Sequence, residues 1–251
     1  IVLSSHDNQG ITNLGTSLRL GEFFESNYKA IAGNEDERIL QYSIWLGMWN
    51  SFKVASLGTL FSLLFCSMCG YALAVYKFKG SNAIFGFMIG SMMIPPILSL
   101  IPYFLIINAI GLMNYHVAVW LPFSIAPIGI FLIRQYVSAS IPKDLLESAK
   151  LDGAGEFRIY FTIVLPLLKP ALATLAIIQF VMIWNNFLQP LVILSGDQTV
   201  AILQVKSMQG TPNSPQGAVM MASFVSMLPL IAVFIVASKQ MIAGLTSGAV
   251  K

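Results

Sequence analysis

Apolar residues gather in five long runs along this 251-residue chain, with shorter polar stretches between them. A helix that crosses a lipid bilayer needs about 20 mostly apolar residues. The runs that reach or approach this length are residues 44–76, 83–110, 117–133, 171–194 and 218–237. The pattern therefore predicts an all-α, polytopic membrane protein with five spanning helices.

The second run is interrupted by prolines, at the pair Pro95-Pro96 and again at Pro102. Proline has no backbone N–H, and its ring clashes with the preceding helical turn, so it kinks or breaks a helix. We therefore expect the second span to be kinked or broken at the Pro95-Pro96 pair and again at Pro102.

Composition supports the membrane assignment. The chain is 56% hydrophobic and 10% charged, with a mean hydropathy of +0.76, whereas a soluble domain carries about 25% charged residues. Lipid is thus the expected surroundings for most of its surface. The net charge of +3 is small and scattered along the chain, so we expect no binding to nucleic acid.

The two cysteines, Cys66 and Cys69, form a CxxC pair inside the first apolar run. This spacing is found in redox and metal sites, but the sequence has no second pair of Cys or His residues to complete one. Free cysteine packs as a small hydrophobic residue. We expect both to pack between helices, and we expect no metal site.

Basic residues predict the orientation, because short loops rich in Lys and Arg stay on the cytoplasmic side. The loop after the first span, the loop at 134–169 and the C-terminal tail carry most of them. Residues 1–43, which hold six of the eleven acidic residues, and residues 195–217, here named the outer loop, fall on the opposite side. We expect residues 1–43 to be extracytoplasmic and residues 44–251 to form the membrane domain.

The stretch that joins the third and fourth spans, residues 138–168, has clear helix signals. Ser140 and Pro142 are typical of a helix start, and Gly153 is typical of a helix stop. The apolar stripe of this short helix consists of Leu145, Leu146 and Ala149. A helix lying on the lipid headgroups is one interpretation. Its lysines are balanced by acidic residues, however, which favours docking into a protein groove.

Within this stretch the sequence resembles the EAA loop of permeases from binding-protein-dependent ABC importers. The similarity consists of Glu147-Ser-Ala149, Gly153 and Ile163-x-Leu165-Pro166, at the spacing of that motif. Ser148 stands where the family more often has Ala. The resemblance implies that residues 138–168 form a coupling loop, whose helix seats in a cleft of a cytoplasmic ATPase subunit.

The resemblance also implies roles for single residues. Glu147 would be the anionic contact with the ATPase, Ala149 a close-packed surface, and Gly153 the turn after the helix. The other coupling residues that it implies are Ser148, Asp152, Phe157, Leu165 and Pro166.

Further stretches resemble the carbohydrate-uptake branch of these permeases, in particular the second permease subunit of maltose-type systems. They are residues 71–78, 93–96, 111–114, 184–191 and 244–251. The transmembrane domain of such type I ABC importers has six spans, so the resemblance implies a first span ahead of Ile1. It also implies a place in the bacterial cytoplasmic membrane.

Signatures of catalysis are not found in the sequence. It contains no Gly-x4-Gly-Lys-Ser/Thr phosphate loop, no HExxH and no GxSxG. We expect no catalytic residue and no cofactor on this chain. The resemblance places ATP and Mg²⁺ on the partner ATPase.

Polar residues in or near the spans are candidates for solute contacts, since sugar hydroxyls pair with amides and sugar rings stack on aromatic side chains. These candidates are Trp184, Asn185, Asn186, Gln189, Gln179, Asn108, Tyr103 and Lys53. For the amides, hydrogen bonding between helices is the alternative. For Lys53, the alternative is an ammonium that reaches the membrane interface.

The outer loop is rich in turn-forming residues between Gln209 and Gln216. Similar permeases use this loop to approach the solute-binding protein, and a plain connector is the alternative. The residues implied in that contact are Gln209, Gly210, Thr211, Pro212 and Asn213.

These features together predict a permease subunit that moves a carbohydrate, an oligosaccharide, into the cell by alternating access. Its expected partners are a second homologous permease, two ABC ATPase subunits, an extracytoplasmic solute-binding protein and membrane lipid. One alternative is a permease for a polyol, a glycerol phosphate or an acidic polysaccharide. An alternative of another class is a membrane-embedded enzyme of lipid or glycan metabolism.

Overall fold

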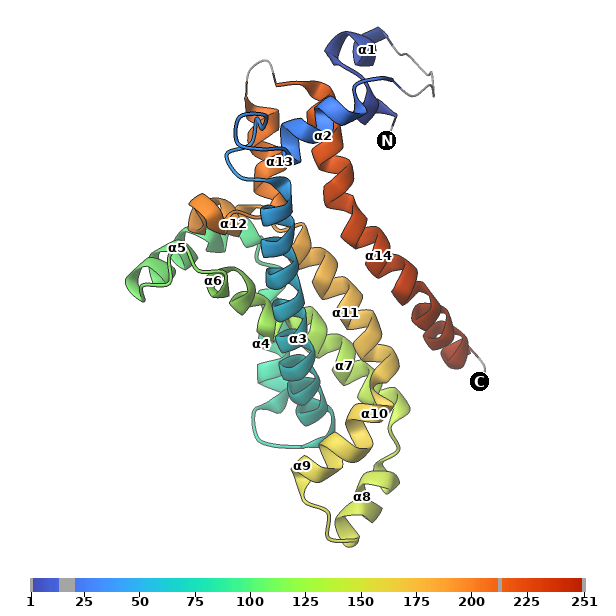
Figure 1. Cartoon of the computed structure of the whole chain (residues 1–251). Coiled ribbons are helices and arrows are strands. Elements are labelled where there is room, and N and C mark those ends of the chain that lie inside the picture. Colours follow the sequence, from blue (N-terminus) through green and yellow to red (C-terminus); the bar gives the residue numbers. More distant parts are fainter. Residues whose placement is uncertain (1, 14–20, 212–213, 250–251) are drawn as a thin grey trace. The chain divides into compact units, whose positions relative to one another are not determined.

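The computed structural model describes residues 2–13, 21–211 and 214–249. All regular structure in these ranges is helical, which confirms the all-α prediction (Figure 1). The longer helices are α3 (Ile44–Val75), α4 (Ser81–Ser91), α5 (Leu100–Ala109), α7 (Pro127–Ser140), α11 (Lys169–Trp184), α13 (Ala201–Gly210) and α14 (Gln216–Ala249). The shorter helices are α1 (Asn8–Asn13), α2 (Phe24–Ala32), α6 (Val117–Trp120), α8 (Lys143–Leu151), α9 (Glu156–Ile159), α10 (Leu165–Leu167) and α12 (Leu188–Ile193).

The chain divides into two compact units. Unit 1 consists of Ile1–Val54, Phe104–Val119 and Trp184–Ala232. Unit 2 consists of Ala55–Tyr103, Trp120–Ile183 and Val233–Lys251.

Among the described residues, three helical segments are long and apolar enough to cross a membrane: Ile44–Val75, Val117–Ser140 and Gln216–Ile235. Two bent helix pairs pass the same test together, which gives up to five spans. This agrees with the five runs predicted from the sequence.

The first bent pair joins Ser81–Ser91 to Pro96–Ala109, with a bend of 99°. Pro95 is in an extended conformation, and Pro96 opens a short 3-10 turn that leads into α5. The break predicted from the Pro95-Pro96 pair is therefore confirmed. A proline pair cannot continue the hydrogen-bond ladder of α4, so the chain changes direction there. The interruption predicted at Pro102 was wrong, because Pro102 lies in the first turn of α5, where a helix tolerates proline.

The fourth span differs from its predicted bounds of 171–194. Helix α11 ends at Trp184, and a separate helix, α12, follows over Leu188–Ile193. The predicted end was therefore wrong, because the polar Asn185-Asn186 pair interrupts the apolar run. At the N-terminal end of α11, the preceding segment Glu156–Leu167 joins the helix at a bend of 77°.

Small residues recur every four positions on one buried face of α3 in unit 2, at Gly58, Ser62, Cys66 and Gly70. A Cβ on Gly58 would lie 2.6 Å from Cδ1 of Ile183 in α11, so the two helices approach closely there. Small side chains permit this approach between membrane helices. The Cys66 thiol, 3.5 Å from the Ser62 hydroxyl, is part of this packing and is not in a disulfide.

In unit 1, the polar N-terminal segment folds as short helices. The Asn27 side chain in α2 donates hydrogen bonds to the carbonyls of Ser4 and His6, both at 3.0 Å. The outer loop contains a regular helix, α13, which the sequence pattern did not predict. Its Gln204 side chain is buried and donates to the carbonyls of Tyr42 and Ser43, so α13 is attached to the start of α3.

Candidate functional site

The coupling loop begins with α8, an amphipathic helix of unit 2. Leu146 and Ala149 are buried, with 4% and 9% of their surface exposed, and they belong to the core of this unit. Leu145 is partly exposed, so it does not complete the predicted stripe. Glu147 and Ser148 are exposed, and the Ser148 hydroxyl donates to the Asp144 carbonyl at 2.8 Å. Ala149 thus packs within this chain, and Glu147 is on the open face.

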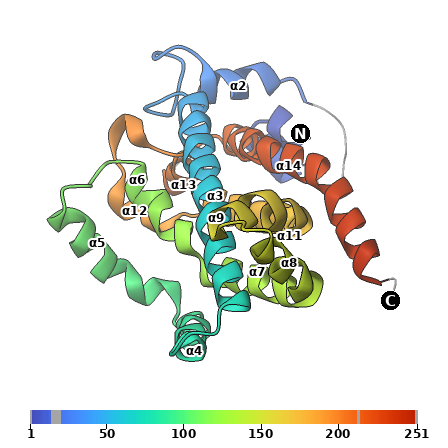
Figure 2. The same cartoon turned by 90° about the horizontal axis from the view of Figure 1, so that it is seen from below.

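Gly153 ends α8 in the way that the sequence predicted. Its φ of +78° is in the left-handed region, which glycine adopts readily. The Gly153 N–H donates to the Lys150 carbonyl and the Ala154 N–H to the Ala149 carbonyl, each at 3.0 Å. This pair of bonds is the Schellman motif, which closes a helix C-terminus. It turns the chain back, so that α9 lies beside α8 (Figures 1 and 2).

A polar chain connects α8 to α9 and to the end of α3, all within unit 2. The Lys150 ammonium lies 2.7 Å from the Glu156 carboxylate, and its hydrogen bond to Glu156 raises the pKa of Lys150. The Tyr76 hydroxyl, just after α3, donates to the same carboxylate. Lys150 also lies over the Tyr76 ring, 5.2 Å from its centroid. None of these three residues was among the predicted site residues, because only the folded chain brings them together.

A second connection lies deeper in the same unit. After α9, residues Tyr160–Val164 form a π-helical turn. The buried Tyr160 hydroxyl lies 2.6 Å from the Ser67 hydroxyl of α3. Two separate polar contacts therefore attach the coupling loop to α3. The predicted coupling residues Leu165 and Pro166 lie in α10, which follows this turn.

The exposed face of the coupling loop is partly apolar. Leu151 at the end of α8 is 88% exposed, and Phe157 in α9 is 71% exposed. Large apolar side chains at such exposure are typical of a surface that contacts another protein. Asp152 and Glu147 are exposed beside them. Phe157, Asp152 and Glu147 are among the contacts predicted from the sequence, whereas Leu151 is not.

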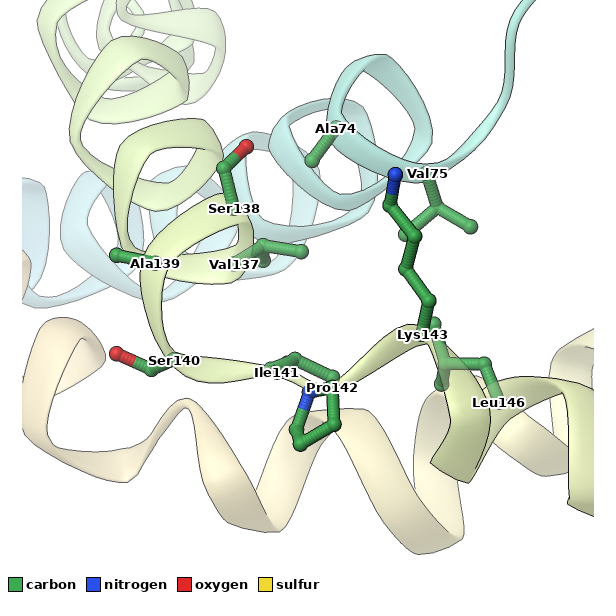
Figure 3. A pocket seen from close by; sticks show the side chains of 10 residues that line it. All are labelled: Ala74, Val75, Val137, Ser138, Ala139, Ser140, Ile141, Pro142, Lys143 and Leu146. Carbon is green, nitrogen blue, oxygen red and sulfur yellow. The ribbon is translucent and has the colours of Figure 1, made fainter.

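A cavity of about 890 Å³ lies beside the start of α8 in unit 2 (Figure 3). Its walls are the end of α3, the end of α7 and the first turn of α8. Lys143 extends its side chain toward Val75 across this space (Figure 3). Leu146, which lines the cavity, also packs in the core, so α8 is held on one side and is open on another.

In unit 1, two of the predicted solute contacts line a smaller cavity of about 200 Å³, Trp184 and Asn185. The indole N–H of Trp184 donates to the Ser226 carbonyl at 3.2 Å. Gln209, predicted to contact the binding protein, lines the same cavity. The folded chain thus brings together residues that the sequence had assigned to two different roles.

The other predicted solute contacts do not line this cavity. The Asn186 amide donates to Gln189 at 2.7 Å, so these two residues pair with each other. Asn108 is exposed on α5, and Tyr103 and Lys53 are partly buried. Gln179 is 0% exposed in the interior of unit 2.

The predicted binding-protein contacts fall at the end of α13. Gly210 is the last residue of this helix, and the Thr211 hydroxyl donates to the Ser207 carbonyl at 2.9 Å. Gln209 accepts a hydrogen bond from Lys206 at 3.0 Å. Pro212 and Asn213 lie outside the described residues.

Comparison with known proteins identifies relatives of this chain. The family model for "Binding-protein-dependent transport system inner membrane component" matches residues 66–243. The arabinooligosaccharides transport system permease protein AraQ of Halalkalibacterium halodurans is 40% identical over 211 residues, which cover 84% of this chain and 75% of AraQ. The melibiose/raffinose/stachyose import permease protein MelC of Bacillus subtilis is 36% identical, covering 80% of this chain and 74% of MelC.

A solved structure has the same fold. It is a bacterial ABC transporter involved in the import of the acidic polysaccharide alginate, and one of its chains matches with a TM-score of 0.77. The match covers 95% of this chain and 87% of that chain, at 21% identity.

The apolar spans and the family match define a multi-pass permease of the cytoplasmic membrane. The chain belongs to the family of inner membrane components of binding-protein-dependent transport systems. This confirms the resemblance first carried by the EAA motif between Glu147 and Pro166.

Proposed function

We propose that this chain is the permease subunit of an ATP-driven importer that moves an oligosaccharide into the cell by alternating access. The observation that carries the proposal is the match over most of the chain to permeases whose names specify arabinooligosaccharides and the melibiose, raffinose and stachyose group. These cargoes are all short sugar chains. Alternating access then requires a partner that supplies the energy.

The proposed energy source is a pair of ABC ATPase subunits that hold ATP and Mg²⁺. The coupling loop supports this proposal, because α8 combines a buried face on Leu146 and Ala149 with an exposed face that carries Glu147. A helix fixed to its own unit on one side can transmit movement from a protein bound on the other. We propose that Glu147, Leu151 and Phe157 contact the ATPase.

The further proposed partners are a second, homologous permease and an extracytoplasmic solute-binding protein. The family is itself described as binding-protein-dependent. The solute then passes between the two permeases. The end of α13 and the residues that follow it are the proposed contact with the binding protein.

Coupling is tested by charge reversal on α8. Glu147→Lys should leave the protein inserted and assembled, but it should abolish sugar uptake in proteoliposomes that contain the whole importer. Asp36→Lys, a reversal at an exposed acidic residue of the N-terminal segment, is the matched control and should transport normally. Gly153→Asp should uncouple as well, because it adds a carboxylate to the exposed turn after α8, where the ATPase is proposed to bind. Normal transport by Glu147→Lys would refute the coupling role.

Cargo is tested separately, by screening the cognate binding protein against sugars and then measuring uptake of the sugar that binds. Binding of an oligosaccharide supports the proposal, and selective binding of a polyol or a glycerol phosphate would overturn the cargo class.

Purification of the protein decides between an importer subunit and an enzyme. A complex with an ATPase that has a phosphate loop supports the importer, whereas a lone subunit that converts lipid would defeat it.

A further inference from the structure

The cavity of about 200 Å³ in unit 1 has walls from three parts of the chain. Trp184 and Asn185 come from the end of α11 and the residue after it. Helix α13 contributes Ile202, Val205, Lys206 and Gln209, and helix α14 contributes Ser223, Ser226, Met227 and Leu230. The cavity is therefore partly apolar and partly polar, and its polar groups include one cation.

Several polar groups at this cavity retain hydrogen-bonding capacity. Lys206 donates one hydrogen bond, to Gln209 at 3.0 Å, and an ammonium has three donors. The Ser223 hydroxyl donates to the Val219 carbonyl at 2.8 Å, which leaves its oxygen able to accept. The Ser226 hydroxyl oxygen is buried and has no hydrogen-bond partner among the described residues. A buried polar atom without a partner is costly, so a ligand that bonds to it gains affinity.

We propose that this cavity is a subsite for one sugar ring of the transported oligosaccharide. A sugar ring has apolar C–H faces and a rim of hydroxyls, each of which can donate and accept. The apolar wall fits the faces, and Lys206, Ser223 and Ser226 fit the rim. Pockets for drug-sized ligands measure about 300–1,000 Å³, so a cavity below that range fits a single ring rather than a whole oligosaccharide.

The position of the subsite gives it a role in the transport cycle. Gln209 lines the cavity and directly precedes the last residue of α13, where the proposed contact with the binding protein begins. A sugar released from the binding protein at this contact would therefore be next to the cavity. The inference rests on the proposed function, because it requires a carbohydrate cargo.

The first test measures protection of a cysteine by sugar. In the assembled importer, Ser223→Cys provides an isosteric thiol at a partly exposed residue that lines the cavity, which a small thiol reagent can label. Labelling should slow by about threefold or more when the cargo sugar is added, because bound sugar blocks the cavity. Ser207→Cys is the matched control, since Ser207 is exposed on α13 but does not line the cavity. Its labelling should not change, and the chain with only its own cysteines gives the background.

The second test measures uptake kinetics. Lys206→Met keeps much of the side-chain volume but removes the ammonium, and it should raise the sugar concentration for half-maximal uptake by roughly 2–10-fold, the loss expected for one hydrogen bond. The maximal rate should stay within about twofold, since the coupling loop is unchanged. Lys77→Met, at a lysine outside the cavity, should leave both values unchanged.

The outcomes separate the two proposals. If the unsubstituted importer transports no carbohydrate, the proposed function fails. If it transports the sugar, but sugar does not protect Ser223→Cys and Lys206→Met has normal kinetics, only the subsite is refuted.

Discussion

At the scale of single residues, Gly153 shows how one backbone position determines the geometry of the coupling loop. Its φ of +78° lies in the left-handed region, while a Cβ added there would meet no atom within 4 Å. The requirement for glycine is therefore conformational and not steric. A residue with a Cβ costs about 1 kcal/mol in this conformation.

Gly153→Ala should accordingly lower the free energy of unfolding by about 1 kcal/mol, and Gly153→Asn by less, because asparagine tolerates the left-handed region better. Gly155→Ala is the matched control in the same loop. Gly155 has a φ of −70°, which any residue adopts, and open space around it. Thermal unfolding of the purified protein in detergent measures the difference. Equal effects at the two glycines would contradict the conformational explanation.

Sequence reasoning predicted Gly153 as a helix stop, because a stop signal depends only on neighbouring residues. It could not predict that Lys150, Glu156 and Tyr76 meet, because their contact depends on how α8, α9 and α3 fold together. Nor did it predict that Ala149 packs inward.

At the scale of elements, apolar runs predicted the spans well because each crossing of a bilayer needs a run of about 20 apolar residues. The same reasoning failed where a few polar residues interrupt or follow an apolar run. It extended the fourth span past Trp184, although α11 ends there, and it missed α13 in the outer loop. Helix α13 depends on tertiary bonds such as those of Gln204, which no local pattern shows.

Gln179 in the interior of α11 provides a test at this scale. It is 0% exposed, and neither atom of its amide group has a hydrogen-bond partner among the described residues. An unpartnered buried polar group costs about 1–3 kcal/mol. Gln179→Leu should therefore raise the thermal stability of the protein in detergent.

The matched control is Gln204→Leu, at a glutamine that is also buried but donates two hydrogen bonds to backbone carbonyls. This variant should be less stable, since the substitution removes bonds that hold α13. If Gln179→Leu and Gln204→Leu changed the stability in the same direction, the explanation by hydrogen-bond partners would be wrong.

At the scale of the whole molecule, transport requires that movement at the coupling loop reach the spanning helices. Unit 2 offers two polar routes to α3, one from Lys150 and Glu156 to Tyr76 and one from Tyr160 to Ser67. The Lys150–Glu156 ion pair is partly exposed, so its net contribution to stability is about 0–1 kcal/mol. A contact that adds little stability can still matter for coupling, because it fixes the position of α8 relative to α9.

Lys150→Gln should therefore change the thermal stability by less than about 1 kcal/mol, yet lower the amount of sugar imported per ATP hydrolysed by the complete importer in proteoliposomes. Lys143→Gln is the matched control on the same helix, since Lys143 makes no ion pair among the described residues and lies in the first turn of α8. An unchanged ratio of sugar to ATP in Lys150→Gln would show that this route does not carry coupling. The Tyr160 contact with Ser67 would then remain as the route from the coupling loop to α3, and Tyr160→Phe would test it by the same ratio.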